Sequence, residues 1–174
     1  MEPLTDNHRD ARALASSVRR ASFADASAIA SVLRESFIEF SEFYTRSAFA
    51  ATAITSEEVC QRMKEGQVWV ALQADKIVGT IAAVVRGKDL YVRGMAVVPS
   101  ARGADLGRSL LAEVERLGWT AGHHRIVLST TPFLTKAIRL YKTRGFQSTN
   151  EGPQTLLGTP LLTMTKSLRP TPGS

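Results

Sequence analysis

The chain has 174 residues, of which 44% are hydrophobic and 22% charged, a balance typical of a globular domain. No apolar run approaches the roughly 18 residues that a membrane span requires, and the single cysteine, Cys60, excludes an internal disulfide framework. Since the first twenty residues also lack the apolar stretch of a secretory signal, the sequence predicts a soluble protein located in the cytoplasm.

Basic residues are concentrated in the second half of the chain. The formal net charge is +6, and the segment 86–146 holds eleven Lys or Arg residues against four Asp or Glu residues. Such a patch suits a polyanionic small molecule as well as a nucleic-acid backbone. Aromatic residues are thinly scattered there, whereas a single-strand binder stacks bases on them. We therefore expect a small anionic ligand as partner rather than a nucleic acid or a membrane.

One domain is expected over residues 18–168. Residues 1–17 are polar and aperiodic, which predicts a disordered N-terminal tail, and residues 169–174 predict a frayed C-terminus. No internal repeat or low-complexity segment divides the part between them. The organisation is therefore a single domain with two short tails.

The first half of this domain is mostly helical in pattern. A short strand from Val18 leads to Asp25, which is expected to cap the N-terminus of a helix. The apolar residues on one face of that helix are Ile29, Val32, Leu33 and Phe37. Residues 38–54 are rich in aromatic rings and suit a helix, a loop or a substrate lid. A second helix is predicted over 55–64, with a capped first turn and an end at Gly66.

From Val68 onward the apolar pattern has the period of strands. Two strands flank a turn at 74–76, and a third covers 89–98. The helix that follows has a buried face of Leu106, Leu110, Val114 and Leu117 and closes near Gly118 or Gly122. The remaining elements are a strand over 125–130, a helix over 135–145, a last strand over 161–168 and one more strand near Phe146. This order predicts an α+β fold, with a mixed, mostly antiparallel sheet and helices on both faces.

The loop from Arg102 to Arg108 joins a strand to a helix N-terminus. Unpaired backbone amides and the positive end of the helix dipole converge at such a point, so it favours an anion. The P-loop motif fits poorly, because three residues rather than four separate Gly103 from Gly107 and no lysine follows. The dinucleotide motif G-x-G-x-x-G is absent as well.

Three segments resemble the GNAT (GCN5-related) N-acetyltransferase superfamily. The loop 102–107, "RGADLG", is similar to the family's acetyl-CoA loop, which has Arg or Gln, two residues, Gly, one residue, and Gly or Ala. The segment 18–30 resembles the family's first strand and helix, and "GMAVVPSARG" resembles its fourth strand running into the loop. Residues 137–146, "AIRLYKTRGF", are similar to its second signature. The resemblance thus covers nearly the whole domain and implies a GNAT-like sheet.

The resemblance implies acetyl-CoA as co-substrate and no metal. It places the pantetheine along Met95, Ala96, Val97 and Val98. It places the pyrophosphate on the amides of Gly103, Ala104, Asp105, Leu106, Gly107, Arg108 and Ser109, with added charge from Arg102, Arg108 and Lys136. The adjacent His123 and His124 would point to opposite faces of a strand, so they are not expected to share a metal.

The resemblance also implies a reaction, acetyl transfer to a primary amine by direct attack in a ternary complex. Tyr141 lies in the second signature and is expected to protonate the leaving thiolate as general acid. Glu35 and Glu39 are candidate general bases, with Glu42 or an ordered water as alternatives. The acceptor could be a small molecule, a peptide or a protein.

Two departures from the family pattern bear on activity. Asp105 stands where glycine is usual, and Leu134 where many members have an asparagine that binds the cofactor. No glutamate lies in the strand before the loop. A catalytically silent, regulatory CoA-binding module is therefore an alternative, and a nucleic-acid binder a more remote one. The rings of Phe37, Phe40, Phe43, Tyr44 and Phe49 are expected in the core, at a homodimer contact or on the wall of an acceptor pocket.

Overall fold

The computed structural model describes residues 15–169. The first strand, β1, spans Ser16–Arg20 and thus begins two residues before the predicted start at Val18. Ser16 and Ser17 therefore belong to the domain rather than to the tail, because they pair with Gln73 and Leu72 of the next strand. The rest of the predicted N-terminal tail, and residues 170–174 at the other end, lie outside the described residues.

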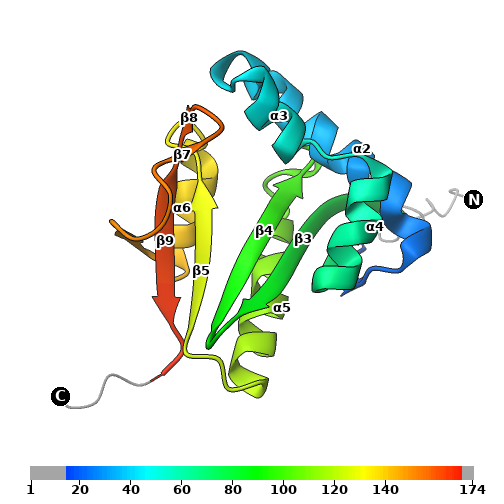
Figure 1. Ribbon diagram of the computed structural model, residues 1–174. Helices are drawn as coiled ribbons and strands as arrows, with labels where there is room; N and C mark the ends of the chain where they lie inside the picture. The colour runs from blue at the N-terminus through cyan, green and yellow to red at the C-terminus, as the bar shows by residue number, and fades with distance from the viewer. Residues whose placement is uncertain (1–14, 170–174) are drawn as a thin grey trace, which may run out of the picture.

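A seven-stranded sheet forms the centre of the molecule, in the order β1-β2-β3-β4-β5-β9-β6 (Figure 1). Its strands after β1 are β2 (Gln67–Gln73), β3 (Lys76–Arg86), β4 (Asp89–Val97), β5 (Arg125–Thr130), β9 (Leu162–Ser167) and β6 (Gln147–Thr149). All neighbours pair antiparallel except β4 and β5, which are parallel. The predicted mixed, mostly antiparallel sheet is confirmed, including the strand near Phe146.

Helices cover both faces of the sheet, as predicted. On one face α2 (Ala26–Phe37) packs on β3 and β4, and α4 (Ser56–Glu65) packs on β2 and β3. On the other face α5 (Leu106–Thr120) crosses behind the same strands, and α6 (Thr135–Thr143) lies behind β5 and β9 (Figure 1). Leu106, Leu110 and Val114 of α5 are buried, so the main core lies between this helix and the sheet.

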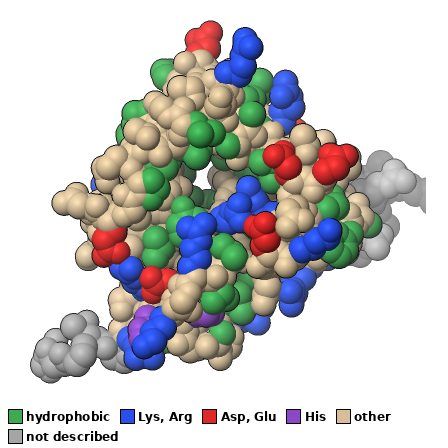
Figure 2. Space-filling model, viewed as in Figure 1, with side chains coloured by type: hydrophobic (Ala, Val, Ile, Leu, Met, Phe, Trp, Pro, Cys, Tyr) green, Lys and Arg blue, Asp and Glu red, His purple; other side chains and the backbone are tan. Residues whose placement is uncertain are grey.

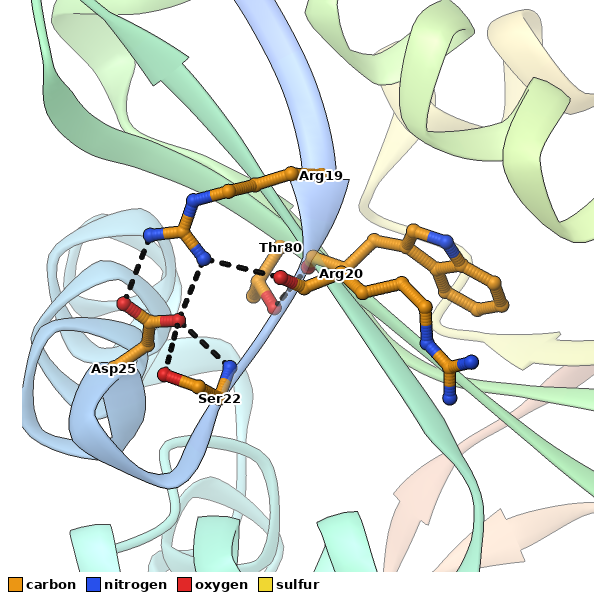
Figure 3. A network of polar contacts seen from close by, with 6 residues as sticks. Arg19, Arg20, Ser22, Asp25 and Thr80 are labelled. Carbon is orange, nitrogen blue, oxygen red and sulfur yellow. Dashed lines mark hydrogen bonds and ion pairs between the residues drawn. The ribbon is translucent and has the colours of Figure 1, made fainter.

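Asp25 occupies the N-cap position of α2, as predicted, but its side chain makes no capping bond to that helix. It lies at the end of a 3-10 turn, Phe23–Asp25, and accepts hydrogen bonds from the Arg19 guanidinium at 2.8 and 3.0 Å. The Ser22 amide donates a third bond at 2.8 Å (Figure 3). The Arg19 contact holds the pKa of Asp25 at about 2, below its ordinary 3.8. Asp25 thus ties β1 to the start of α2.

Residues 38–54 form two short helical segments. A 3-10 segment, Ile38–Phe43, continues from α2, and α3 spans Arg46–Thr52. A small hairpin, β7 (Thr155–Leu156) and β8 (Thr159–Pro160), lies against the start of α3. The Thr45 amide donates to Thr159 Oγ1 at 2.9 Å, and the Thr45 hydroxyl donates to the Leu157 carbonyl at 2.8 Å. Sequence patterning predicted neither α3 as a separate element nor this hairpin.

Candidate active site

The strands β4 and β5 separate part of the way along their length. They pair only from Asp89 with Arg125 to Val92 with Leu128. β5 then continues along β9 as far as Thr130, whereas the β5-facing edge of β4 beyond Val92 has no partner strand in the described part of the chain. The two strands therefore open into the V that Figure 1 shows between them.

A bulge in β4 begins at this point. Ala82 of β3 pairs with Arg93, and Thr80 pairs with Ala96, so Gly94 and Met95 together face the single residue Ile81. Gly94 has φ +69°, a left-handed conformation that glycine adopts without steric cost. Because a bulge re-aims the chain, it brings the free edge of Met95–Val97 to the opening.

One cavity of about 850 Å³ fills the opening. Its lining comes from both faces of the sheet, so we call its two parts the α5 side and the α2 side. The α5 side is lined by Gly103, by residues 105–108 and by α6, and the α2 side by α2, by α4 and by the aromatic residues near them. Figure 2 shows the hollow from the α2 face, with Lys and Arg side chains gathered beside it.

Most of the predicted cofactor residues line this cavity. Those that do are Met95, Ala96, Val97, Arg102, Gly103, Asp105, Leu106, Gly107, Arg108 and Lys136, together with the two predicted catalytic residues Tyr141 and Glu39. Val98, Ala104, Ser109 and Glu35 do not line it.

For two of the predicted residues that do not line the cavity, the hydrogen bonds show why. The Val98 amide donates to the Val78 carbonyl at 2.9 Å, so it serves the sheet and is not free for a ligand. The Ser109 amide and hydroxyl both donate to the Asp105 carbonyl, at 3.0 and 3.1 Å, because Ser109 already belongs to the hydrogen-bonded part of α5. The free amides are thus those of the first helical turn, Leu106 to Arg108.

The loop before α5 is shaped by two left-handed residues. Gly103 has φ +85° and Asp105 has φ +57°, and aspartate is among the few non-glycine residues that tolerate this region. The Asp105 side chain makes no capping hydrogen bond and is exposed. At Gly107 a Cβ would lie 3.1 Å from Leu140 Cδ2 and 3.7 Å from Met95 Cε. Glycine there lets the first turn of α5 approach both α6 and β4.

Arg102 and Glu39, both predicted site residues, form an ion pair with each other. Arg102 Nη1 lies 2.5 Å from Glu39 Oε1, and the same guanidinium donates to the carbonyls of Val97 and Ser36, each at 3.1 Å. These contacts join the loop to α2. Glu35 is exposed outside the cavity lining.

Tyr141 is placed by α6 with its ring in the core and one edge on the cavity. It is 6% exposed, and its ring centre lies 5.9 Å from that of Phe146. Burial raises the pKa of the Tyr141 phenol well above its ordinary 10.0. The hydroxyl therefore keeps its proton at neutral pH.

Three of the aromatic residues of 37–49 line the cavity, namely Phe37, Phe40 and Tyr44. Phe37 and Tyr44 are also buried, whereas Phe43 is 62% exposed and lies outside the lining. Three rings pack around Phe133, which sequence reasoning missed because it lies far away in the chain, between β5 and α6. The ring centre of Phe133 is 4.9 Å from that of Tyr44, 5.3 Å from Phe43 and 6.2 Å from Phe40.

Some of the Lys and Arg residues in the second half of the chain form ion pairs with acidic residues away from the cavity. Arg125 contacts Asp89 and Glu151, each at 2.9 Å, and Glu115 pairs with Arg144 and with Lys166. On the α5 side of the cavity, Arg108 and Lys136 are exposed and form no ion pair with another described residue. Two exposed cations are therefore open to a ligand on this side of the cavity.

A profile of the acetyltransferase (GNAT) family matches residues 29–146. The chain belongs to this family. Human N-acetyltransferase 8B is 29% identical over 89 residues, which are 48% of this chain and 39% of that protein. The match thus spans well under half of the human relative. Across residues 15–169, no helix has the length and apolarity to cross a membrane.

Solved GNAT structures have the same fold. PaiA N-acetyltransferase from Thermoplasma acidophilum, solved with coenzyme A, has a TM-score of 0.73 at 17% identity, covering 88% of this chain and 99% of that one. YncA from Salmonella typhimurium, solved with acetyl-CoA, scores 0.70 at 21% identity over 91% and 97%. The Escherichia coli ribosomal-protein-S18-alanine N-acetyltransferase scores 0.71 at 16% identity over 90% and 96%. At these identities the likeness shows the fold alone.

Proposed function

We propose that this protein is an N-acetyltransferase that moves the acetyl group of acetyl-CoA to a primary amine by direct attack in a ternary complex. The observation that carries the proposal is a single cavity that passes between β4 and β5. It joins the N-terminus of α5 on one face of the sheet to an aromatic-walled space on the other. Such a passage lets two substrates meet from opposite sides.

The α5 side suits the cofactor. The free amides of Leu106, Gly107 and Arg108 would bind the pyrophosphate, with the side chains of Arg108 and Lys136 adding charge. The unpaired edge of Met95–Val97 would bind the pantetheine as an added strand. A backbone amide there would also donate to the thioester oxygen.

The amine would approach from the α2 side. Its nitrogen attacks the thioester carbonyl carbon, a C–N bond forms, and the C–S bond breaks as the tetrahedral intermediate collapses. Tyr141 gives its proton to the departing sulfur and recovers one from solvent. The nitrogen loses its proton to water, because Glu39 is paired with Arg102 and Glu35 lies outside the cavity. A water base predicts a rate that rises with pH as more amine becomes neutral.

The substitution Tyr141→Phe tests this assignment. It removes only the hydroxyl, so we expect kcat to fall by about 100-fold or more while the dissociation constant of CoA changes less than about twofold. Thiol release from acetyl-CoA with a panel of amines gives kcat, and calorimetric titration gives CoA affinity. Tyr91→Phe is the matched control, because the Tyr91 hydroxyl donates to Ser129 at 3.1 Å and has no part in the reaction proposed. An equal loss in both variants would contradict the role of Tyr141. A wild-type protein that binds CoA and acetylates no amine would refute the proposed activity.

A further inference from the structure

Arg62 extends from α4 toward the bulge of β4 and lines the α2 side of the cavity. A Cβ at Gly94 would collide with Arg62 Nη1 and would also contact Leu33 of α2. Gly94 is therefore the residue that leaves space for this guanidinium. The arrangement puts a positive charge next to the segment Met95–Val97, where the reaction is proposed to occur.

Arg62 differs from its neighbouring arginines because it has no partner. Arg93 pairs with Glu65 at 2.6 Å, and the Arg86 guanidinium lies 4.1 Å from the ring centre of Tyr91. Within residues 15–169, no hydrogen bond or ion pair joins the Arg62 guanidinium to another side chain. Burial, together with the charge of Arg93, lowers the pKa of Arg62 to about 10, although the charges of Glu65 and Glu58 partly oppose this shift. Arg62 is thus still a cation at neutral pH, and no carboxylate contacts its half-buried guanidinium directly, so an anion that binds there would stabilise it.

A buried hydroxyl on the cavity wall also lacks a hydrogen bond. It is Ser36 Oγ, in a residue that is 3% exposed. Ser36 lies on α2 one turn after Leu33, the residue that shares the Gly94 space with Arg62. On the opposite wall Thr131 follows β5 within hydrogen-bonding reach of the Tyr44 phenol. Unpaired buried polar atoms are rare in native proteins, so Ser36 Oγ favours a polar ligand in this cavity.

We propose that Arg62 binds the carboxylate of the acceptor, which makes the acceptor a small amino acid with an apolar side chain. This inference rests on the proposed function. The Arg62 guanidinium lies against Gly94, which directly precedes Met95 in the chain, so a carboxylate bound to it would lie within about 3–7 Å of the segment Met95–Val97, the length of one or two extended residues. That span matches the separation of amine and carboxylate in an α- or β-amino acid. A protein lysine or a peptide N-terminus carries no carboxylate so close to its amine. The rings of Phe40, Tyr44 and Phe133 would contact the apolar side chain.

The test compares amino acids with their carboxamides, using the full chain. The probes are L-phenylalanine, L-tyrosine, L-tryptophan, L-leucine and L-methionine, each paired with its carboxamide, which keeps the shape and the amine but loses the charge. For at least one pair we expect kcat/KM to favour the acid by roughly tenfold or more. Arg62→Gln should abolish that preference, mainly by raising KM, and Arg62→Lys should restore part of it. Arg34→Gln is the matched control, because Arg34 is exposed on α2 outside the cavity lining.

A second readout keeps the test independent of turnover. Calorimetric titration of each probe into the CoA-saturated protein should show tighter binding of the acid, and this difference should vanish in Arg62→Gln while CoA affinity stays unchanged and the unfolding temperature does not fall. Carboxamides that bind and react as well as the acids would overturn the acceptor assignment and leave the acetyltransferase standing. If the acids bind in an Arg62-dependent way and no amine is acetylated, the carboxylate site would stand and the acetyltransferase activity would be refuted.

Discussion

The α5 side of the cavity is built from main chain, whereas the α2 side is built from side chains that come from separate elements. The first consists of helix amides, two left-handed residues and the bare backbone of Gly107. The second combines Ser36 of α2, Arg62 of α4 and Phe133 from the β5–α6 loop. A surface of backbone amides suits a ligand shared by a whole family. A surface of assembled side chains can change its ligand by substitution, which is where the specificity of this chain is expected to lie.

Gly94 lines the cavity and contacts Arg62. Among the substitutions considered, a change of Gly94 should lower the stability of the fold most. In Gly94→Ala the methyl group would meet a left-handed φ and the Arg62 guanidinium at once. We expect the free energy of unfolding to fall by about 2–4 kcal/mol and acetylation to be lost. Gly87→Ala is the matched control, because Gly87 has φ +60° with no atom within 4 Å of the added carbon. Chemical denaturation measures the free energy of unfolding of both variants. If the two variants lose the same amount, the contact with Arg62 adds nothing to the destabilisation of Gly94→Ala.

The Arg19–Asp25 contact joins β1 to the start of α2, and its contribution to stability depends on pH. Its pKa of about 2 lies below the ordinary 3.8, so the Arg19–Asp25 contact stabilises the fold above about pH 4 and is lost as the pH falls toward 2. Allowing for solvent screening, we expect about 1–2 kcal/mol of stability to disappear over this range. Asp25→Asn should flatten that part of the stability profile in denaturation experiments between pH 2 and 5. An unaltered slope in the variant would show that other carboxylates carry the acid sensitivity.

Asp105→Gly should have the smallest effect and tests the main-chain character of the α5 side. The proposed pyrophosphate site consists of backbone amides, and the Asp105 side chain makes no capping bond. Glycine also adopts the left-handed conformation of this turn, so the amides keep their positions. We expect the CoA dissociation constant to stay within about twofold or to tighten slightly. Asp105→Val is the contrasting variant, since a β-branched residue is strained at φ +57°. A large loss of affinity in the glycine variant would mean that the carboxylate itself holds the loop.

Features that depend on interactions between residues close in sequence could be predicted, whereas contacts between distant residues could not. The order of helices and strands along the chain and the start of α5 depend on period, capping and turn chemistry within a few residues, so the sequence predicted them. The Thr55 cap of α4 and its end at Gly66 were predicted for the same reason. The Arg102–Glu39 ion pair joins residues 63 positions apart, and no local pattern indicates it. The same holds for Phe133 among the rings of 40–44 and for Arg62 beside Gly94.

A crystal structure with CoA tests the central claim most directly. We predict the pyrophosphate on the amides of Leu106 to Arg108, the pantetheine along Met95–Val97, and the sulfur within about 3.5 Å of the Tyr141 hydroxyl. The acceptor side of the sulfur should then open onto Arg62 and the aromatic wall. A CoA molecule bound elsewhere, or a sulfur that points away from Tyr141 with α6 in its present position, would contradict the account.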